Sequence, residues 1–123
     1  MKKILIIEDD KNIVLSLKMY LEKLKYEVVV ASDGLQGIEQ AQEKVPDLIM
    51  LDIILPKMDG YMVCEALKKE TNTKNIPIVF ISAKTGEKDI DKAFEVGGDD
   101  FIVKPFNHEK IKKVLENFLK EGK

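Results

Sequence analysis

The sequence predicts an α/β fold, a three-layer sandwich in which helices cover both faces of a five-stranded parallel sheet. Five short apolar runs alternate with five segments whose apolar residues recur at helical spacing. The connections are short, and parallel neighbours need a crossover that is usually a helix. The apolar runs are also continuous instead of alternating, which is typical of strands buried on both faces.

The first half of the chain supplies three strands and two helices. Residues 3–7 and 26–31 are the first two apolar runs, and the second contains three consecutive valines. Its Glu27 favours an edge position, because a charge there discourages pairing with another sheet. Pro46 follows the second helix, and residues 48–51 are the third strand. The apolar residues that mark the two helices are Ile13, Leu17, Leu21 and Leu24, then Leu35, Ile38, Ala41 and Val45.

The second half adds two strands and three helices. A Pro-Lys-Met-Asp-Gly turn precedes the third helix, and residues 78–81 and 101–103 are the last two strands. Gly97 and Gly98 end the fourth helix by adopting backbone angles that other residues resist. The apolar residues that mark the helices are Val63, Ala66 and Leu67, then Ile90, Ala93 and Phe94, then Ile111, Val114, Leu115, Phe118 and Leu119.

The composition limits the classes of function. A chain of 123 residues has the length of one domain, and its 20 basic residues are offset by 22 acidic ones. This balance gives no sign of a nucleic-acid or membrane surface. No apolar run approaches the roughly 20 residues that a membrane span needs, so we expect a cytoplasmic protein. Cys64 is the one cysteine, and we expect it to be a small packing residue of the third helix.

Polar residues follow four of the five predicted strands. Glu8 and Asp9 end the first strand, and Asp52, Ser82 and Lys104 end the third, fourth and fifth. Ligands of open α/β sheets bind beyond the carboxyl ends of the strands, so these side chains are candidates for one site. Burial alone does not require polar residues in these places.

The carboxylates of Glu8, Asp9 and Asp52 predict a cation site. Without a cation they would raise one another's pKa and destabilise the fold. Mg²⁺ fits, because it accepts one or two protein carboxylates while keeping waters and a phosphate oxygen. Asp52 would then be an ionised nucleophile beside a metal, and Lys104 and Ser82 would complete a set sufficient for phosphoryl transfer.

Each candidate also has a simpler interpretation. The acidic run after the first strand could cap the first helix, and capping is the interpretation we prefer for Asp10. Asp52 and Lys104 could be solvated surface residues, and Ser82 could be a turn residue. His108 lies near the predicted start of the last helix, where we expect a solvated residue without a role.

Four segments carry motifs in an order and at spacings that recur in one protein family: ILIIEDD, PDLIMLDIILPKMDGYMVCEALK, IPIVFISAK and GGDDFIVKPF. With them the chain resembles the receiver domain of the bacterial response-regulator family, the phosphoacceptor part of two-component signalling. One motif alone would be weak, but the set is highly specific. The resemblance implies a stand-alone receiver domain over residues 1–120, a tail of 121–123, and a flavodoxin-like (βα)5 fold with the family's strand order 2-1-3-4-5.

The resemblance implies how the acids act. Asp52 would accept a phosphoryl group from a sensor histidine kinase or a histidine phosphotransfer protein. Asp9, Asp52 and the backbone carbonyl of Ile54 would bind Mg²⁺ (or Mn²⁺) directly, and Glu8 would act partly through water. Such a protein catalyses its own phosphoryl transfer and a slow autodephosphorylation, and is not a conventional turnover enzyme.

The resemblance also implies a switch in the last two strands. Ser82, Ala83 and Lys104 would contact the phosphoryl oxygens, Ser82 and Phe101 would move inward on activation, and the bond before Pro105 is a candidate for the cis form. The phosphoryl group adds a charge of about −1.5 to −2, enough to shift the loop after the fourth strand. That shift would change the binding of an unspecified downstream protein at the face of the fourth helix, fifth strand and fifth helix. We expect no direct nucleic-acid or membrane contact, and a monomer or a phosphorylation-dependent dimer.

Three positions depart from part of the family. Ile54 has no polar side chain two positions after the phosphoacceptor, and we expect it to hinder an attacking water and slow loss of the phosphoryl group. Phe101 replaces the tyrosine of some members, so its switching cannot use a phenolic hydrogen bond. Ser82 replaces the common threonine and keeps the hydroxyl.

Other functions fit the residues less well. A metal-dependent phosphatase with Asp52 as a transient nucleophile would need a second acid at position 54. A flavin or nucleotide carrier would need a Gly-rich phosphate loop after the first strand, where this chain has Asp-Asp-Lys-Asn. The closest alternative is a receiver-like interaction module that is no longer phosphorylated, and the complete residue set argues against it.

Overall fold

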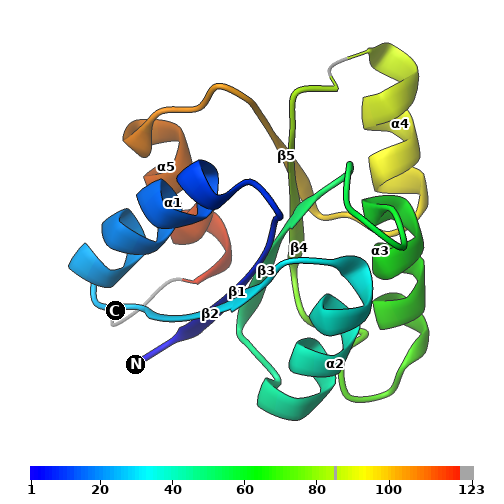
Figure 1. Cartoon of the computed structure of the whole chain (residues 1–123), viewed down its shortest axis with the longest axis horizontal. Coiled ribbons are helices and arrows are strands. Elements are labelled where there is room, and N and C mark those ends of the chain that lie inside the picture. The colour runs from blue at the N-terminus through cyan, green and yellow to red at the C-terminus, as the bar shows by residue number, and fades with distance from the viewer. Residues whose placement is uncertain (85, 120–123) are drawn as a thin grey trace.

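Strands and helices alternate along the chain in the computed structural model, which describes residues 1–84 and 86–119 (Figure 1). The elements are β1 (Lys3–Ile7), α1 (Lys11–Lys23), β2 (Glu27–Ala31), α2 (Gly34–Lys44), β3 (Leu48–Asp52), α3 (Gly60–Lys69), β4 (Ile78–Ser82), α4 (Glu87–Glu95), β5 (Asp100–Val103) and α5 (His108–Phe118). The predicted strands and helices are confirmed. The domain end at residue 120 and the tail of 121–123 lie outside the described residues and stay predictions.

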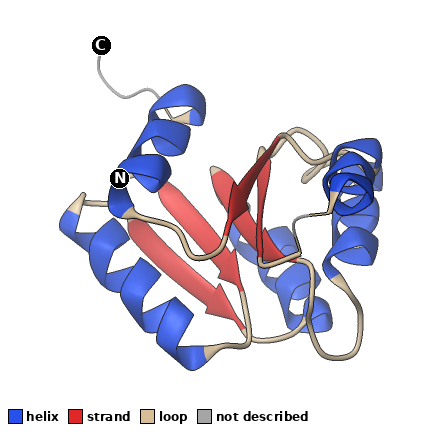
Figure 2. Ribbon diagram, turned by 90° about the horizontal axis from the view of Figure 1, so that it is seen from above, coloured by secondary structure: helices blue, strands red, loops and turns tan. Residues whose placement is uncertain are grey.

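All the strand pairs of the sheet are parallel, and the strand order is β2-β1-β3-β4-β5. α1 and α5 cover one face, and α2, α3 and α4 cover the other (Figure 1). Figure 2 shows the same sheet between its two helix layers, seen from above. The fold and the strand order are therefore those that the sequence predicted.

Each strand divides its side chains between two cores, because successive residues point to opposite faces. In β1, Leu5 and Ile7 pack toward α2, α3 and α4, while Ile4 and Ile6 pack toward α1 and α5. All four are fully buried, and burial of such a side chain stabilises the fold by about 1.5–3 kcal/mol. β2 is an edge strand and is less buried, as its Glu27 predicted.

Three of the apolar residues that marked the predicted helices are exposed. Leu35, Val45 and Phe94 expose 55%, 49% and 47% of their surfaces. The buried residues of α2 are Gly34, Gly37 and Ala41, and Val45 lies beyond the helix with φ of 44°. In α4 the neighbouring Ala93 takes the buried position, so Phe94 is rotated about 100° away from the core.

Candidate functional site

The acidic run after β1 divides into two kinds of residue. The Asp10 side chain caps α1, because its Oδ1 accepts the backbone N–H groups of Asn12 at 2.9 Å and Ile13 at 3.3 Å. This confirms the interpretation of Asp10 as a cap. The Glu8 carboxylate instead accepts the backbone N–H of Asp10 at 3.1 Å, and this bond holds it at the end of the strand.

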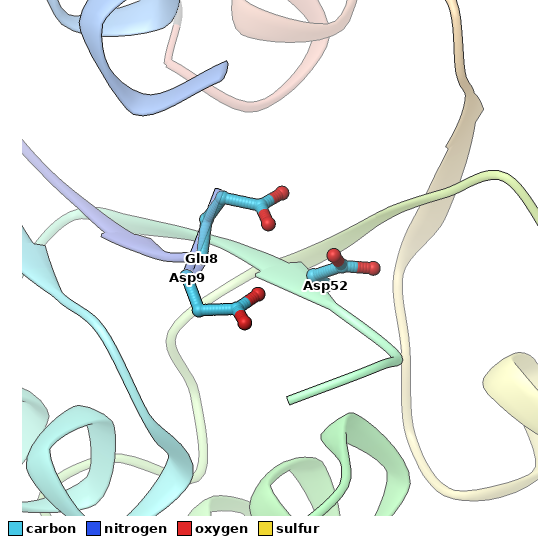
Figure 3. A group of neighbouring side chains, drawn as sticks. All are labelled: Glu8, Asp9 and Asp52. Atoms are coloured by element: carbon cyan, nitrogen blue, oxygen red, sulfur yellow. The ribbon is translucent and has the colours of Figure 1, made fainter. Parts of the chain in front are cut away.

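Three carboxylates gather where β1 and β3 end (Figure 3). Glu8, Asp9 and Asp52 each offer an oxygen, and these oxygens lie within 4.8 Å of one another. Figure 3 shows the Glu8 and Asp9 side chains extending from the end of β1 toward the side of Asp52. Glu8 is 1% exposed and Asp52 5%, whereas Asp9 is exposed to solvent. The predicted meeting of these acids is therefore observed.

Lys104 reaches the same cluster from beyond β5. Its Nζ donates to Glu8 Oε1 at 2.8 Å and to Asp52 Oδ2 at 2.9 Å. Both are short charge-assisted bonds, and they bring groups from three strands into direct contact. The predicted ammonium group is therefore in place beside Asp52.

The electrostatics of the cluster leave a negative charge unmatched. Burial raises the pKa of the Glu8 carboxyl to about 7, Lys104 opposes that shift, and the negative charge of Asp52 adds to it. Burial alone would lower the pKa of Lys104, but its bonds to the two carboxylates outweigh it and raise that pKa. Fully ionised, three carboxylates face one ammonium group. Carboxylate oxygens with an excess of negative charge are suitable ligands for Mg²⁺, so the residues present fit the predicted ion.

Ser82 is the last residue of β4, one position after the Ile81 that pairs with Asp52 of β3, and Ala83 follows it. Ser82 is fully buried, and its Oγ accepts the backbone N–H of Lys84 at 3.2 Å. The backbone N–H of Lys104 donates to the Ser82 carbonyl at 2.9 Å, which holds the ends of β4 and β5 together. Ala83 is exposed and lines a groove with Lys104 and Pro105. The bond between Lys104 and Pro105 is cis.

Two further predicted residues differ in their exposure to solvent. Phe101 is 8% exposed and stacks on Phe80, with ring centroids 6.4 Å apart. Ile54 follows Asp52 in the chain and is 60% exposed, while its backbone N–H points to Asp52 Oδ1 at 3.4 Å. Phe101 is thus inward in this structure, and the Ile54 side chain is free to meet an approaching water.

Some contacts had no clear sequence signal. Lys57 has φ of 72° in the turn before α3, and its Nζ lies 3.5 Å from Oδ2 of Asp33, the N-cap of α2. The Pro-Lys-Met-Asp-Gly segment predicted a turn but not this contact. His108 is exposed as expected, yet its ring stacks on Tyr20 with centroids 3.9 Å apart.

Cys64 is a buried packing residue, as predicted. It has no exposed surface, and its Sγ lies 3.5 Å from the carbonyl oxygen of Val96. Burial raises the pKa of its thiol to about 12. The thiol is therefore protonated at neutral pH and has no part in the site.

Comparison with known proteins decides the family. Residues 4–116 match the family model described as response regulator receiver domain. The chain belongs to this family. The receiver chain is 37% identical over 121 residues to the alkaline phosphatase synthesis transcriptional regulatory protein PhoP of Bacillus subtilis, covering 98% of this chain and 50% of PhoP. It is 43% identical over 109 residues to the transcriptional regulatory protein YxdJ of the same organism, covering 89% of the chain and 46% of YxdJ.

Solved structures agree with this assignment. A two-component response regulator from Clostridium difficile superposes on the receiver chain with a TM-score of 0.92 at 31% identity, covering 98% of each chain. The receiver domain of the sensor histidine kinase PA1611 from Pseudomonas aeruginosa gives 0.89 at 26% identity, covering 95% of this chain and 96% of that one. That domain is described with a magnesium ion coordinated in its active-site cleft.

The predicted family and fold are therefore confirmed, and the predicted acidic cluster is present. The receiver chain spans about half the length of the curated relatives named above. Within the described residues, no helix combines the length and the hydropathy that crossing a membrane would demand.

Proposed function

We propose that this receiver is a phosphorylation-activated switch whose Asp52 accepts a phosphoryl group from a histidine of a sensor kinase or phosphotransfer protein. The observation that supports it most is the placement of Asp52 against Lys104 and within reach of two further acids. Asp52 needs no general base, since an ionised carboxylate attacks phosphorus directly while the bond from phosphorus to the donor's histidine nitrogen breaks.

The charged side chains divide the work of the transfer. Asp9, Asp52 and the Ile54 carbonyl would hold Mg²⁺ (or Mn²⁺), with Glu8 acting partly through water. The ion supplies positive charge that offsets the charge on the transferred group. Lys104 and the Ser82 hydroxyl would bind the phosphoryl oxygens, with Ala83 beside them. The receiver thus promotes its own phosphorylation and a slow autodephosphorylation, without the turnover of a conventional enzyme.

The output would be a change of binding partner at the face of α4, β5 and α5. Phe94 of α4 and Val103 of β5 are exposed there, at 47% and 43%, and Phe101 of β5 is buried. A phosphoryl group bound by Ser82 and Lys104 would pull on the ends of β4 and β5. The loops that follow these strands lead into α4 and α5, so the face would change. The partner would be a downstream protein in the cytoplasm, or a second copy of the receiver in a phosphorylation-dependent dimer.

The test is phosphorylation by a small donor such as acetyl phosphate with Mg²⁺, followed by intact mass and peptide mapping. We expect one phosphoryl adduct on Asp52 that is lost when Mg²⁺ is chelated and in Asp52→Asn. Asp99→Asn, an acid at the opposite edge of the sheet, is the matched control and should still be phosphorylated. Unchanged mass of the wild-type receiver would instead support an interaction module that no longer accepts phosphate.

A further inference from the structure

We propose that Gly60 is a positioning residue, which sets the place of Asp52 and of the backbone that follows it through direct contact. This inference rests on the proposed function and names a residue outside its charged set. Gly60 is the first residue of α3, far in the chain from the acids of β1 and from Lys104. Gly60 lies against the backbone of Asp52 and Ile53, which connects the phosphoacceptor side chain to the Ile54 carbonyl.

A hydrogen bond joins the start of α3 to the residue after β3. The Gly60 N–H donates to the Ile53 carbonyl at 2.7 Å. The preceding Asp59 caps the helix by accepting the Met62 N–H at 3.0 Å, so the first turn of α3 is itself anchored. The helix start is therefore tied to the residue directly after Asp52.

Position 60 has no space for a side chain. A Cβ on Gly60 would overlap the carbonyl oxygen of Asp52, and would lie 2.8 Å from the Cα of Ile53. Gly60 does not have the left-handed φ that favours glycine, as Gly97 does at 111°. The close approach of the two backbones, and not a backbone angle, is what requires glycine at this position.

A side chain at position 60 would force either the end of β3 or the start of α3 to move. β3 is a central strand that pairs with both β1 and β4, so Asp52 is held on two sides by the sheet. A methyl group at position 60 would instead displace the Asp52–Ile53 peptide or push the start of α3 away. Either movement shifts the Asp52 carboxylate relative to Lys104, or shifts the Ile54 carbonyl relative to the acids.

The experiment compares Gly60→Ala with Gly98→Ala. A Cβ on Gly98 would lie 2.7 Å from the Ala93 carbonyl oxygen and 2.8 Å from the Phe80 ring, so this position is also crowded, though less than position 60, and Gly98 precedes β5 at the opposite edge of the sheet. Mg²⁺ affinity is measured by calorimetry, acetyl phosphate labelling by mass, and the backbone amide shifts of Ile53 and Ile54 by NMR of metal-free protein. All three are read at a temperature where circular dichroism shows the variants folded.

We expect Gly60→Ala to bind Mg²⁺ about 10- to 100-fold more weakly, to label more slowly, and to shift both amides, while Gly98→Ala changes none of these. Asp59→Ala, which loosens the same helix start, should weaken Mg²⁺ binding in the same direction and serves if Gly60→Ala does not fold. Equal Mg²⁺ affinity and labelling in Gly60→Ala, Asp59→Ala and Gly98→Ala would overturn the proposal. Failure of the wild type to label would refute the proposed function instead, and the amide shifts and Mg²⁺ affinities would still decide the role of Gly60.

Discussion

Two lysines lie in comparable surroundings at opposite edges of the sheet. At the carboxyl edge, Lys104 donates to Glu8 and Asp52. At the amino edge, Lys68 of α3 donates to the Ile76 carbonyl at 3.0 Å and to Asp99 Oδ2 at 3.1 Å. Both side chains are mostly shielded from solvent, with 15% and 21% exposed.

The two edges differ in how their charges balance. The Asp99 carboxylate accepts both from Lys68 and from the backbone N–H of Ile78 at 2.8 Å, so one acid matches one amine. At the carboxyl edge, the cluster of Glu8, Asp9 and Asp52 has three carboxylates, and Lys104 is the amine that bonds to it among the described residues. The Lys68–Asp99 pair has no excess charge and links two elements of the fold. The cluster around Lys104 has excess negative charge, so it suits a bound cation, and phosphorylation would change its charge further.

The largest expected effect separates these two lysines. Lys104→Met should lower the rate of labelling by acetyl phosphate about 10²- to 10³-fold, because a charge that stabilises the transferred group is lost. It should also destabilise the metal-free receiver by about 3 kcal/mol, since two buried carboxylates lose their partner. Saturating Mg²⁺ should restore part of that stability, as measured by urea unfolding with and without the ion. A labelling rate equal to that of the wild type would remove Lys104 from the site.

The matched change at the other edge should affect stability alone. Lys68→Met removes the bonds to Asp99 and Ile76, and we expect a loss of about 1–2 kcal/mol in the free energy of unfolding. Labelling of Asp52 and Mg²⁺ affinity should stay at their wild-type values. Slower labelling in this variant, measured on folded protein, would show that the two edges are not independent.

The contrast between the edges also shows what the sequence could predict. Glu8, Asp9, Asp52 and Lys104 were identified because strand order and strand ends place them at one edge, and the structure does bring them together. The pairing of Lys68 with Asp99 follows no motif, since it depends on how the last turn of α3 meets the start of β5.

Gly60 shows the same limit of sequence reasoning. Its Asp-Gly pair predicted a turn, but the backbone contact with Asp52 exists only after α3 has packed. The sequence also does not show which of two adjacent apolar residues is buried when the buried face of a helix is narrow. Phe94 is the example, because the small Ala93 takes the buried position.

The charge excess at the carboxyl edge predicts a pH dependence of the metal-free receiver. Burial raises the pKa of Glu8 from 4.5 to about 7 on folding, so between these values the folded state binds more protons than the unfolded state. Stability should then fall as the pH rises through this window, by roughly 2–3 kcal/mol. Urea unfolding in chelator from pH 5 to 8 measures it.

Glu8→Gln is the control for that experiment, because it keeps the shape of the side chain without a titrating proton. The variant should show a flatter profile than the wild type over the same range. Profiles that run parallel would mean that Glu8 is ionised in the folded metal-free receiver and that Lys104 fully compensates it.

The smallest expected effect concerns how long the switch stays on. Ile54 exposes 60% of its surface two residues after Asp52, and an apolar group there neither orients nor activates a water. Ile54→Asn should speed loss of the phosphoryl group several-fold, because an amide can hold an attacking water by hydrogen bonds. Ile54→Val, equally apolar, is the control and should decay at the wild-type rate. The decay is followed by intact mass after removal of the donor. Since the Ile54 side chain belongs to neither charge cluster, a change in decay with an unchanged labelling rate would separate the lifetime of the phosphoryl group from its acceptance. Equal decay in all three proteins would instead show that the attacking water does not pass the Ile54 side chain.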